Sequence, residues 1–285
     1  MGVIRDLDCT VRDSPLFGLA LVLTLVAAGF NGLMVLLMML ELDLPGAFGQ
    51  MTHFQEPHHR VHDLTFGFLF IPAVVGILAQ FRRPARNVAG QLMALIPTVG
   101  LLLTLLLTLL AGDTRALQPP WVTVGAAALL ALGLHPAGRE FFSSFSLSRV
   151  DRSMFLLVLV AAVPLLVFAA SNIGLQGSTV DEHAAAGHYG FMAAFSFTVV
   201  GLGVLASIRP NGWRLTSWVA GLLPSLLGIV SLVYPVSSGL SLSWAVAAIG
   251  WGAGFIVVSE RIRVREGPPL GAGAGREVAG EMRSD

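Results

Sequence analysis

The chain contains no lysine, a single cysteine and few charged residues. Only 12% of the residues are charged and 55% are hydrophobic, which is more apolar surface than a water-soluble fold can hide. The formal net charge is zero and no basic run occurs, so nucleic acid is excluded as an expected partner. Cys9 stands alone and cannot form an intrachain disulfide. The composition predicts a membrane protein embedded in the lipid bilayer.

Several catalytic signatures are also missing from the sequence. It contains no glycine-rich phosphate loop, no Cys-x-x-Cys, no nucleophile elbow and no zinc-protease histidine pair. The sequence therefore assigns no catalytic residue, and whether the protein is an enzyme stays open.

Long apolar runs dominate the rest of the chain. The first run, Leu16 to Leu40, is longer than the roughly 7–15 apolar residues of a signal peptide, so a retained helix is expected. At about 20 apolar residues per crossing, the runs predict an all-α protein with eight transmembrane helices. These are expected near residues 16–40, 61–80, 88–111, 121–137, 153–172, 186–208, 215–234 and 243–259.

The distribution of arginine predicts the orientation. With a cytoplasmic N-terminus, fifteen of the seventeen arginines fall on the inner side and only Arg60 and Arg115 fall outside. Positive charge favours the cytoplasmic side of a membrane, so both termini are expected in the cytoplasm and the protein in the cell membrane.

A pattern of glutamate, histidine and Arg-Pro occurs twice, 126 residues apart. Glu56, His62 and Arg83-Pro84 recur as Glu182, His188 and Arg209-Pro210. This internal repeat predicts two four-helix halves, and an even number of crossings per half makes the halves parallel. The expected divisions are a cytoplasmic segment 1–15, a first half 16–137, a cytoplasmic linker 138–152, a second half 153–259 and a disordered cytoplasmic tail 260–285.

Histidines and carboxylates gather where the second and sixth predicted helices meet the outer surface. Imidazoles spaced three or four residues apart on a helix can share a face and ligate a transition metal. The cofactor-binding candidates are His59, His62 and His188. The metal-ligand candidates are His58, His59, His62, His183, His188, Glu56, Asp63 and Glu182.

Two of these candidates carry alternatives. His183 and His188 are five residues apart, which fits one helical face only if His183 lies in the loop before the helix. Asp63 lies inside a span, so it should face the bundle and pair with Arg60, a histidine or a cation. Imidazoles and acids are also common at membrane boundaries simply because water solvates them there.

The metal remains open between copper, zinc and haem iron. Methionines near the outer surface, such as Met34 and Met192, would suit copper, although methionine is also ordinary apolar filler.

The run Glu56-Pro57-His58-His59-Arg60 resembles the Glu-x-x-His-Arg motif of haem A synthase. That family is also built from two four-helix halves with cytoplasmic termini, so the resemblance implies haem binding through His59 with Glu56. The family has further haem-ligand histidines at the outer ends of its fourth and eighth helices. The corresponding stretches here, around Trp121 and Ser243, contain none.

The segments His62 to Gly67, Leu78 to Pro84 and Gly187 to Met192 resemble uncharacterised multi-pass membrane proteins of actinobacterial type. This resemblance brings no activity with it.

Three functions are compatible with these observations. The first is a protein that binds a metal or haem through the outer cluster, with His62 and His188 meeting between the two halves. The second is a structural or assembly partner of another membrane protein, which includes a homo-oligomer. The third is a transporter of a small solute or metal, although Asp63 is the one acidic residue expected within the spans.

Overall fold

The computed structural model describes residues 14–39, 57–112 and 119–266, and all regular secondary structure in these ranges is helical. The α-helices are α2 (Pro15–Met39), α3 (Pro57–Phe68), α4 (Phe70–Gln80), α5 (Val88–Leu110), α6 (Pro119–Gly133), α7 (Arg152–Ser178), α8 (Glu182–Ala185), α9 (His188–Ile208), α10 (Trp213–Val233) and α11 (Leu242–Glu266). Three short 3₁₀ helices, Pro84–Arg86, Gly138–Ser144 and Leu147–Arg149, lie in the connections.

Seven helical segments of the described ranges are long and apolar enough to cross a membrane, which confirms a multi-helical apolar fold. One of them, His59–Gln80, combines α3 and α4. The two helices are separated at Leu69 because Pro72 has no N–H to bond the carbonyl of Phe68.

The predicted crossing at 121–137 is a shorter helix than expected. α6 has 15 residues, or about 22 Å of length at 1.5 Å per residue, against a hydrocarbon thickness of about 30 Å. The helix ends at Gly133, and Pro136 follows within the next turn. Eight full-length crossings are therefore not established by this fold.

Two helices run further than the hydropathy predicted. α7 continues past residue 172 to Ser178, where the side chains of Asn172 and Ser178 bond carbonyls one turn back. The predicted disordered tail is wrong over residues 260–266, because these residues form the last turns of α11. Glu260 there pairs with Arg214 of α10 and with Arg263. Basic residues near a helix C-terminus also stabilise the helix by their interaction with its dipole. Hydropathy detects the apolar part of a helix and misses the polar residues at its end.

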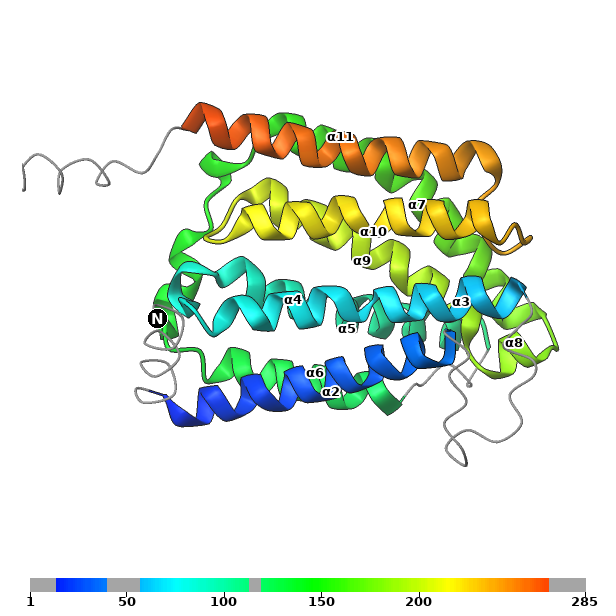
Figure 1. Cartoon of the computed structure of the whole chain (residues 1–285), viewed down its shortest axis with the longest axis horizontal. Coiled ribbons are helices and arrows are strands. Elements are labelled where there is room, and N and C mark those ends of the chain that lie inside the picture. The colour runs from blue at the N-terminus through cyan, green and yellow to red at the C-terminus, as the bar shows by residue number, and fades with distance from the viewer. Residues whose placement is uncertain (1–13, 40–56, 113–118, 267–285) are drawn as a thin grey trace, which may run out of the picture.

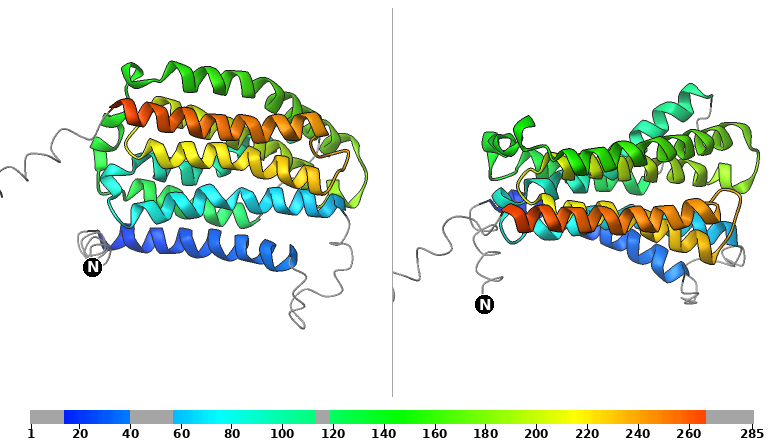
Figure 2. Two further views of the ribbon diagram at one scale, coloured as in Figure 1. Left: turned by 45° about the horizontal axis from the view of Figure 1, so that its top comes forward. Right: turned by 90° about the horizontal axis from the view of Figure 1, so that it is seen from above.

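The helices form two layers (Figures 1 and 2). The first layer contains α2, α3 with α4, α10 and α11, and the second contains α6, α5, α9 and α7. Contacts join α2 to α6, α4 to α5, α10 to α9 and α11 to α7 across the layers. α9 and the α3–α4 segment lie at the centre of the assembly and touch each other.

The flanking helices expose large apolar side chains. On α7, Leu156 is 62% exposed, Val163 66% and Val167 65%. The central helix α9, in contrast, is mostly buried. A face of this kind is stable in contact with lipid hydrocarbon and not with water.

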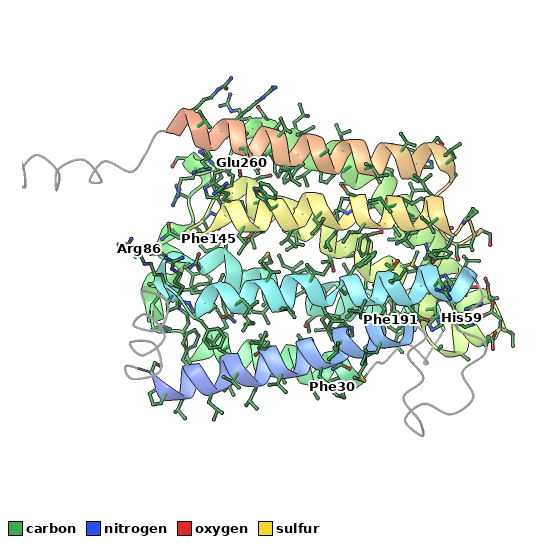
Figure 3. All side chains as sticks on the ribbon, viewed as in Figure 1. Phe30, His59, Arg86, Phe145, Phe191 and Glu260 are labelled. Atoms are coloured by element: carbon green, nitrogen blue, oxygen red, sulfur yellow. The ribbon has the colours of Figure 1, made fainter. Side chains whose placement is uncertain are left out.

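The bundle has two chemically distinct ends. We call the end where α3 and α9 begin and where α8 lies the histidine end, and the opposite end the arginine end. Figure 3 shows His59 and Phe191 at the histidine end, with Arg86 and Glu260 at the arginine end. The repeated Arg83-Pro84 and Arg209-Pro210 both follow helices that finish at the arginine end.

His135, just beyond α6 at the arginine end, is buried and structural. Gln80 Oε1 accepts a hydrogen bond from its Nε2 at 3.2 Å. Its Nδ1 accepts one from the N–H of Ala137, so the ring is neutral with the proton on Nε2. Burial, opposed by a hydrogen bond to the backbone of Pro84, lowers the pKa of His135 to about 4.

We expect this histidine to make the protein sensitive to acid. Its folded-state pKa lies below its ordinary value of 6.5, so between these values the unfolded chain binds a proton that the folded chain does not. Stability should therefore fall as the pH drops from about 6.5 to 4, by up to about 3 kcal/mol. Thermal unfolding of wild type and His135→Gln across this range checks the prediction. An equal pH dependence of the two proteins would contradict it.

Candidate metal centre

Three imidazoles from separate segments converge at the histidine end. His59 of α3, His183 of α8 and His188 of α9 each offer a nitrogen, and these three atoms lie within 4.8 Å of one another. Nδ1 of His183 and Nδ1 of His188 are 3.3 Å apart. His59 and His188 are buried, and His183 is partly exposed. We call His59, His183 and His188 the histidine trio.

The local sequence explains how α3 delivers its histidines. Pro57 begins the helix, a position where its missing N–H costs no hydrogen bond. His59 and His62 follow three residues apart, on one face, and both are buried, with His62 fully inaccessible. The prediction that these two residues share a face is confirmed.

His183 reaches the trio because it precedes the long helix. It lies on the one-turn helix α8, and Gly187 then adopts a left-handed φ of 75° before α9 starts at His188. Across this turn the two rings lie at a centroid distance of 5.5 Å. His183 therefore lies before the helix that carries His188, which is the condition that the five-residue spacing required for the two residues to meet.

Polar side chains hold α8 in place. Asp181 caps its N-terminus by accepting from the N–H of Ala184 at 2.7 Å, and its second oxygen accepts from the Tyr189 hydroxyl at 2.9 Å. Gln176 of α7 donates to the carbonyl of Ala184 and accepts from the N–H of Gly190. The position of His183 is therefore fixed by both neighbouring helices.

The histidine trio also affects the pKa of the Asp181 carboxyl. Burial alone would raise the pKa of this carboxyl, but the hydrogen bonds from Ala184 and Tyr189, together with the nearby His183 and His188, lower it below its ordinary value. Asp181 thus stays ionised at neutral pH and gives the solvent side of the trio a negative potential.

Asp63 lies behind His188, on the bundle side. Its Oδ1 is 3.7 Å from Nε2 of His188, the nitrogen opposite the one that faces His183. Of the partners predicted for this carboxylate, a histidine is the one found, while the guanidinium of Arg60 lies over the ring of Tyr234. A carboxylate at the outer nitrogen of a metal-binding imidazole fixes its tautomer and orientation.

His62 adjoins the trio without joining it. Its ring centroid is 5.2 Å from that of His183 and 5.4 Å from that of His188. Its Nε2 bonds Oγ of Ser238 at 2.8 Å, and Ser238 belongs to the loop between α10 and α11. The short distance between their rings shows that the repeated His62 and His188 lie at the same depth. His62 is nevertheless outside the group whose nitrogens converge.

Of the other predicted site residues, Glu182 lies beside the trio, while Glu56 and the side chain of His58 are outside the described part of the chain. Glu182 begins α8, and its Oε1 is 3.5 Å from Nε2 of His59. Met192 packs in the hydrophobic core. Glu56 lies outside the described residues, and of His58 only the backbone position in α3 is described.

The sequence did not reveal two supporting residues, Ser238 and Gln176. Ser238 lies in the loop between α10 and α11, far from the histidines in sequence, whereas Gln176 lies near His183 in sequence but on a different helix, α7. Serine and glutamine are too common to attract notice. The polar stretch at the end of α7 was the one available signal for Gln176.

The trio suits a single metal ion better than a haem. Imidazole is a ligand for zinc, copper, iron and nickel, and two ligands bonded to a tetrahedral ion at about 2.0–2.1 Å are about 3.3 Å apart. That matches the separation of the His183 and His188 nitrogens. A haem held between two axial imidazoles needs space for its macrocycle between the rings, and the rings of His59 and His183, with centroids 4.4 Å apart, leave no such space.

Comparisons of the chain with protein-family models, with curated proteins and with solved structures found no match.

Proposed function

We propose that this protein is a multi-pass membrane protein that binds one transition-metal ion through His59, His183 and His188. The observation that carries the proposal is the convergence of three imidazole nitrogens within 4.8 Å, two of them on residues that are buried. Three protein ligands are enough to hold an ion with one further position for a fourth.

The surroundings of the trio support ligation over simple solvation. Histidines that merely sit at a membrane boundary would point to water, whereas His59 is 3% exposed and His188 8%. The carboxylate of Asp63 at the outer nitrogen of His188 and the fixed turn of α8 pre-organise the ligands. Such outer partners usually change metal affinity by about 10- to 100-fold.

The metal content of the purified protein tests the proposal. Protein solubilised without chelators, loaded with Zn²⁺ and freed of excess ion should retain one zinc per chain by elemental analysis, and its visible spectrum should lack a haem band. Retention of no ion above the level of the detergent blank would contradict metal binding, and a stoichiometric haem band would contradict the choice of a bare ion.

We further propose that the chain consists of two parallel halves, α2 to α6 and α7 to α11, related by a twofold axis along the membrane normal. The arrangement of the layers supports this proposal. The twofold axis would relate α2 to α7, α3–α4 to α9, α5 to α10 and α6 to α11. In each of these pairs the two partners lie in opposite layers. The close approach of the His62 and His188 rings, 5.4 Å apart, fits their place near such an axis.

The arginine end is proposed to face the cytoplasm, with the protein in the cell membrane. The excess of arginine there supports this orientation. A reporter active only in the cytoplasm, fused after residue 266, should be active, and one inserted between residues 113 and 118 should be silent. The reverse pattern would overturn the orientation, and activity at both sites would contradict a crossing by α6.

A further inference from the structure

We propose that Glu182 is the fourth ligand of the ion and that Glu182 and Asp63 together make the site selective for a divalent ion of the zinc class over Cu⁺. This inference rests on the metal binding proposed above. It assigns the ion class and a role to each of two carboxylates.

Glu182 occupies the solvent side of the trio. Its Oε1 lies 3.5 Å from Nε2 of His59, close to the roughly 3.3 Å expected between two ligand atoms of one tetrahedral ion. Its side chain is 65% exposed, so it can rotate toward the remaining nitrogens without disturbing packed neighbours. The neighbouring Asp181 cannot serve in the same way, because both of its oxygens already accept hydrogen bonds.

Asp63 occupies the bundle side. Its side chain is 14% exposed, and its Oδ2 is buried with no hydrogen-bond partner among the described residues. A carboxylate in such a place is costly unless positive charge lies near. An ion on Nδ1 of His188 would supply that charge through the imidazole ring, whose Nε2 faces Oδ1 of Asp63.

Among the three imidazoles, Glu182 and Asp63, the charges balance for a divalent ion, while the Asp181 carboxylate lies outside this set and is engaged by Ala184 and Tyr189. The three imidazoles are neutral ligands, Glu182 and Asp63 each contribute one negative charge, and an ion of charge two brings the sum to zero. With Cu⁺ these groups would retain one negative charge, which is unfavourable beside the largely buried carboxylate of Asp63.

The donor atoms favour the same class of ion. The ligand set consists of three nitrogens and one carboxylate oxygen, which suits Zn²⁺ and related divalent ions, whereas Cu⁺ prefers sulfur. Methionine sulfur is a poor candidate here, because Met192, one turn beyond His188 on α9, is buried in the hydrophobic core.

Metal titration of the full-length protein and three variants tests the inference. Zn²⁺ and, under reducing conditions, Cu⁺ are titrated into wild type, Glu182→Gln, Asp63→Asn and Asp181→Asn, and the visible spectrum of the Co²⁺-loaded proteins reports the coordination. Asp181→Asn is the matched control, because it removes one negative charge beside the trio while asparagine still caps α8.

Wild type should bind Zn²⁺ more tightly than Cu⁺. Glu182→Gln and Asp63→Asn should each weaken Zn²⁺ binding on the order of 10- to 100-fold and leave Cu⁺ binding nearly unchanged. The Co²⁺ spectrum should change in Glu182→Gln, which loses a ligand, and stay the same in Asp63→Asn and Asp181→Asn.

Three results would overturn the inference while leaving metal binding intact. These are a Glu182→Gln protein with wild-type Zn²⁺ affinity and Co²⁺ spectrum, an equal loss of Zn²⁺ affinity in Asp181→Asn and Glu182→Gln, or a wild type that prefers Cu⁺. A wild type that binds no metal at all would instead sink the proposed function, and this inference with it.

Discussion

Substituting His188 by alanine should abolish stoichiometric binding of Zn²⁺, as should the same change at His59 or His183. Each substitution removes one of three converging nitrogens, and two remaining imidazoles no longer enclose the ion. We expect the affinity to fall by at least about 100-fold, beyond the effect of losing an outer partner. Equilibrium dialysis with Zn²⁺ measures the loss.

Two other histidines serve as controls for this result. His135→Gln at the arginine end should retain the ion, because His135 bonds Gln80 far from the trio. His62→Ala should also retain one ion per chain, although more weakly, since His62 packs against His183 and His188 without joining their nitrogens. Loss of the ion in His62→Ala with retention in His59→Ala would favour a pair of His62 and His188 over the trio.

Replacing Gly76 by alanine should destabilise the bundle by about 1–3 kcal/mol, the usual cost of overpacking. A β-carbon on Gly76 of α4 would collide with the carbonyl oxygen of Gly90 on α5. Small residues allow such close backbone approach between membrane helices, and a backbone carbonyl cannot move aside as a flexible side chain can.

The same substitution at Gly29 is the matched control. Gly29 lies inside α2, and a β-carbon there would meet no atom within 4 Å. Gly29→Ala should therefore stabilise the protein by about 0.5–1 kcal/mol, because alanine favours the helix over glycine. Thermal unfolding of the two variants in the same detergent measures both effects. A change of the same sign in both would contradict the close packing of α4 on α5.

The sequence predicted the helical spans well because lipid imposes one strong constraint. Every backbone polar group within the bilayer needs an internal partner, so a long apolar run such as Val88–Leu110 can hardly be anything but a helix. The ends were predicted less well. α7 and α11 continue through polar residues, whose side chains find partners on neighbouring turns and helices.

The candidate site was predicted as a region rather than as a set of ligands. Spacing placed His59 and His62 on one face, and the repeat placed His62 level with His188. Spacing could not show that the turn at Gly187 aims His183 at His188, since that depends on one left-handed residue and on Gln176 of a different helix. The pairing of Asp63 with His188 likewise depends on the contact between α3 and α9, which no local pattern reveals.

The most direct test of the trio is X-ray absorption at the zinc edge of the Zn²⁺-loaded protein. The arrangement predicts a first shell of nitrogen and oxygen at about 2.0–2.1 Å, with outer-shell scattering from three imidazole rings, reduced to two rings in His59→Ala if weak binding persists at high Zn²⁺. A shell of sulfur, or a spectrum without imidazole scattering, would contradict a metal ion held by His59, His183 and His188.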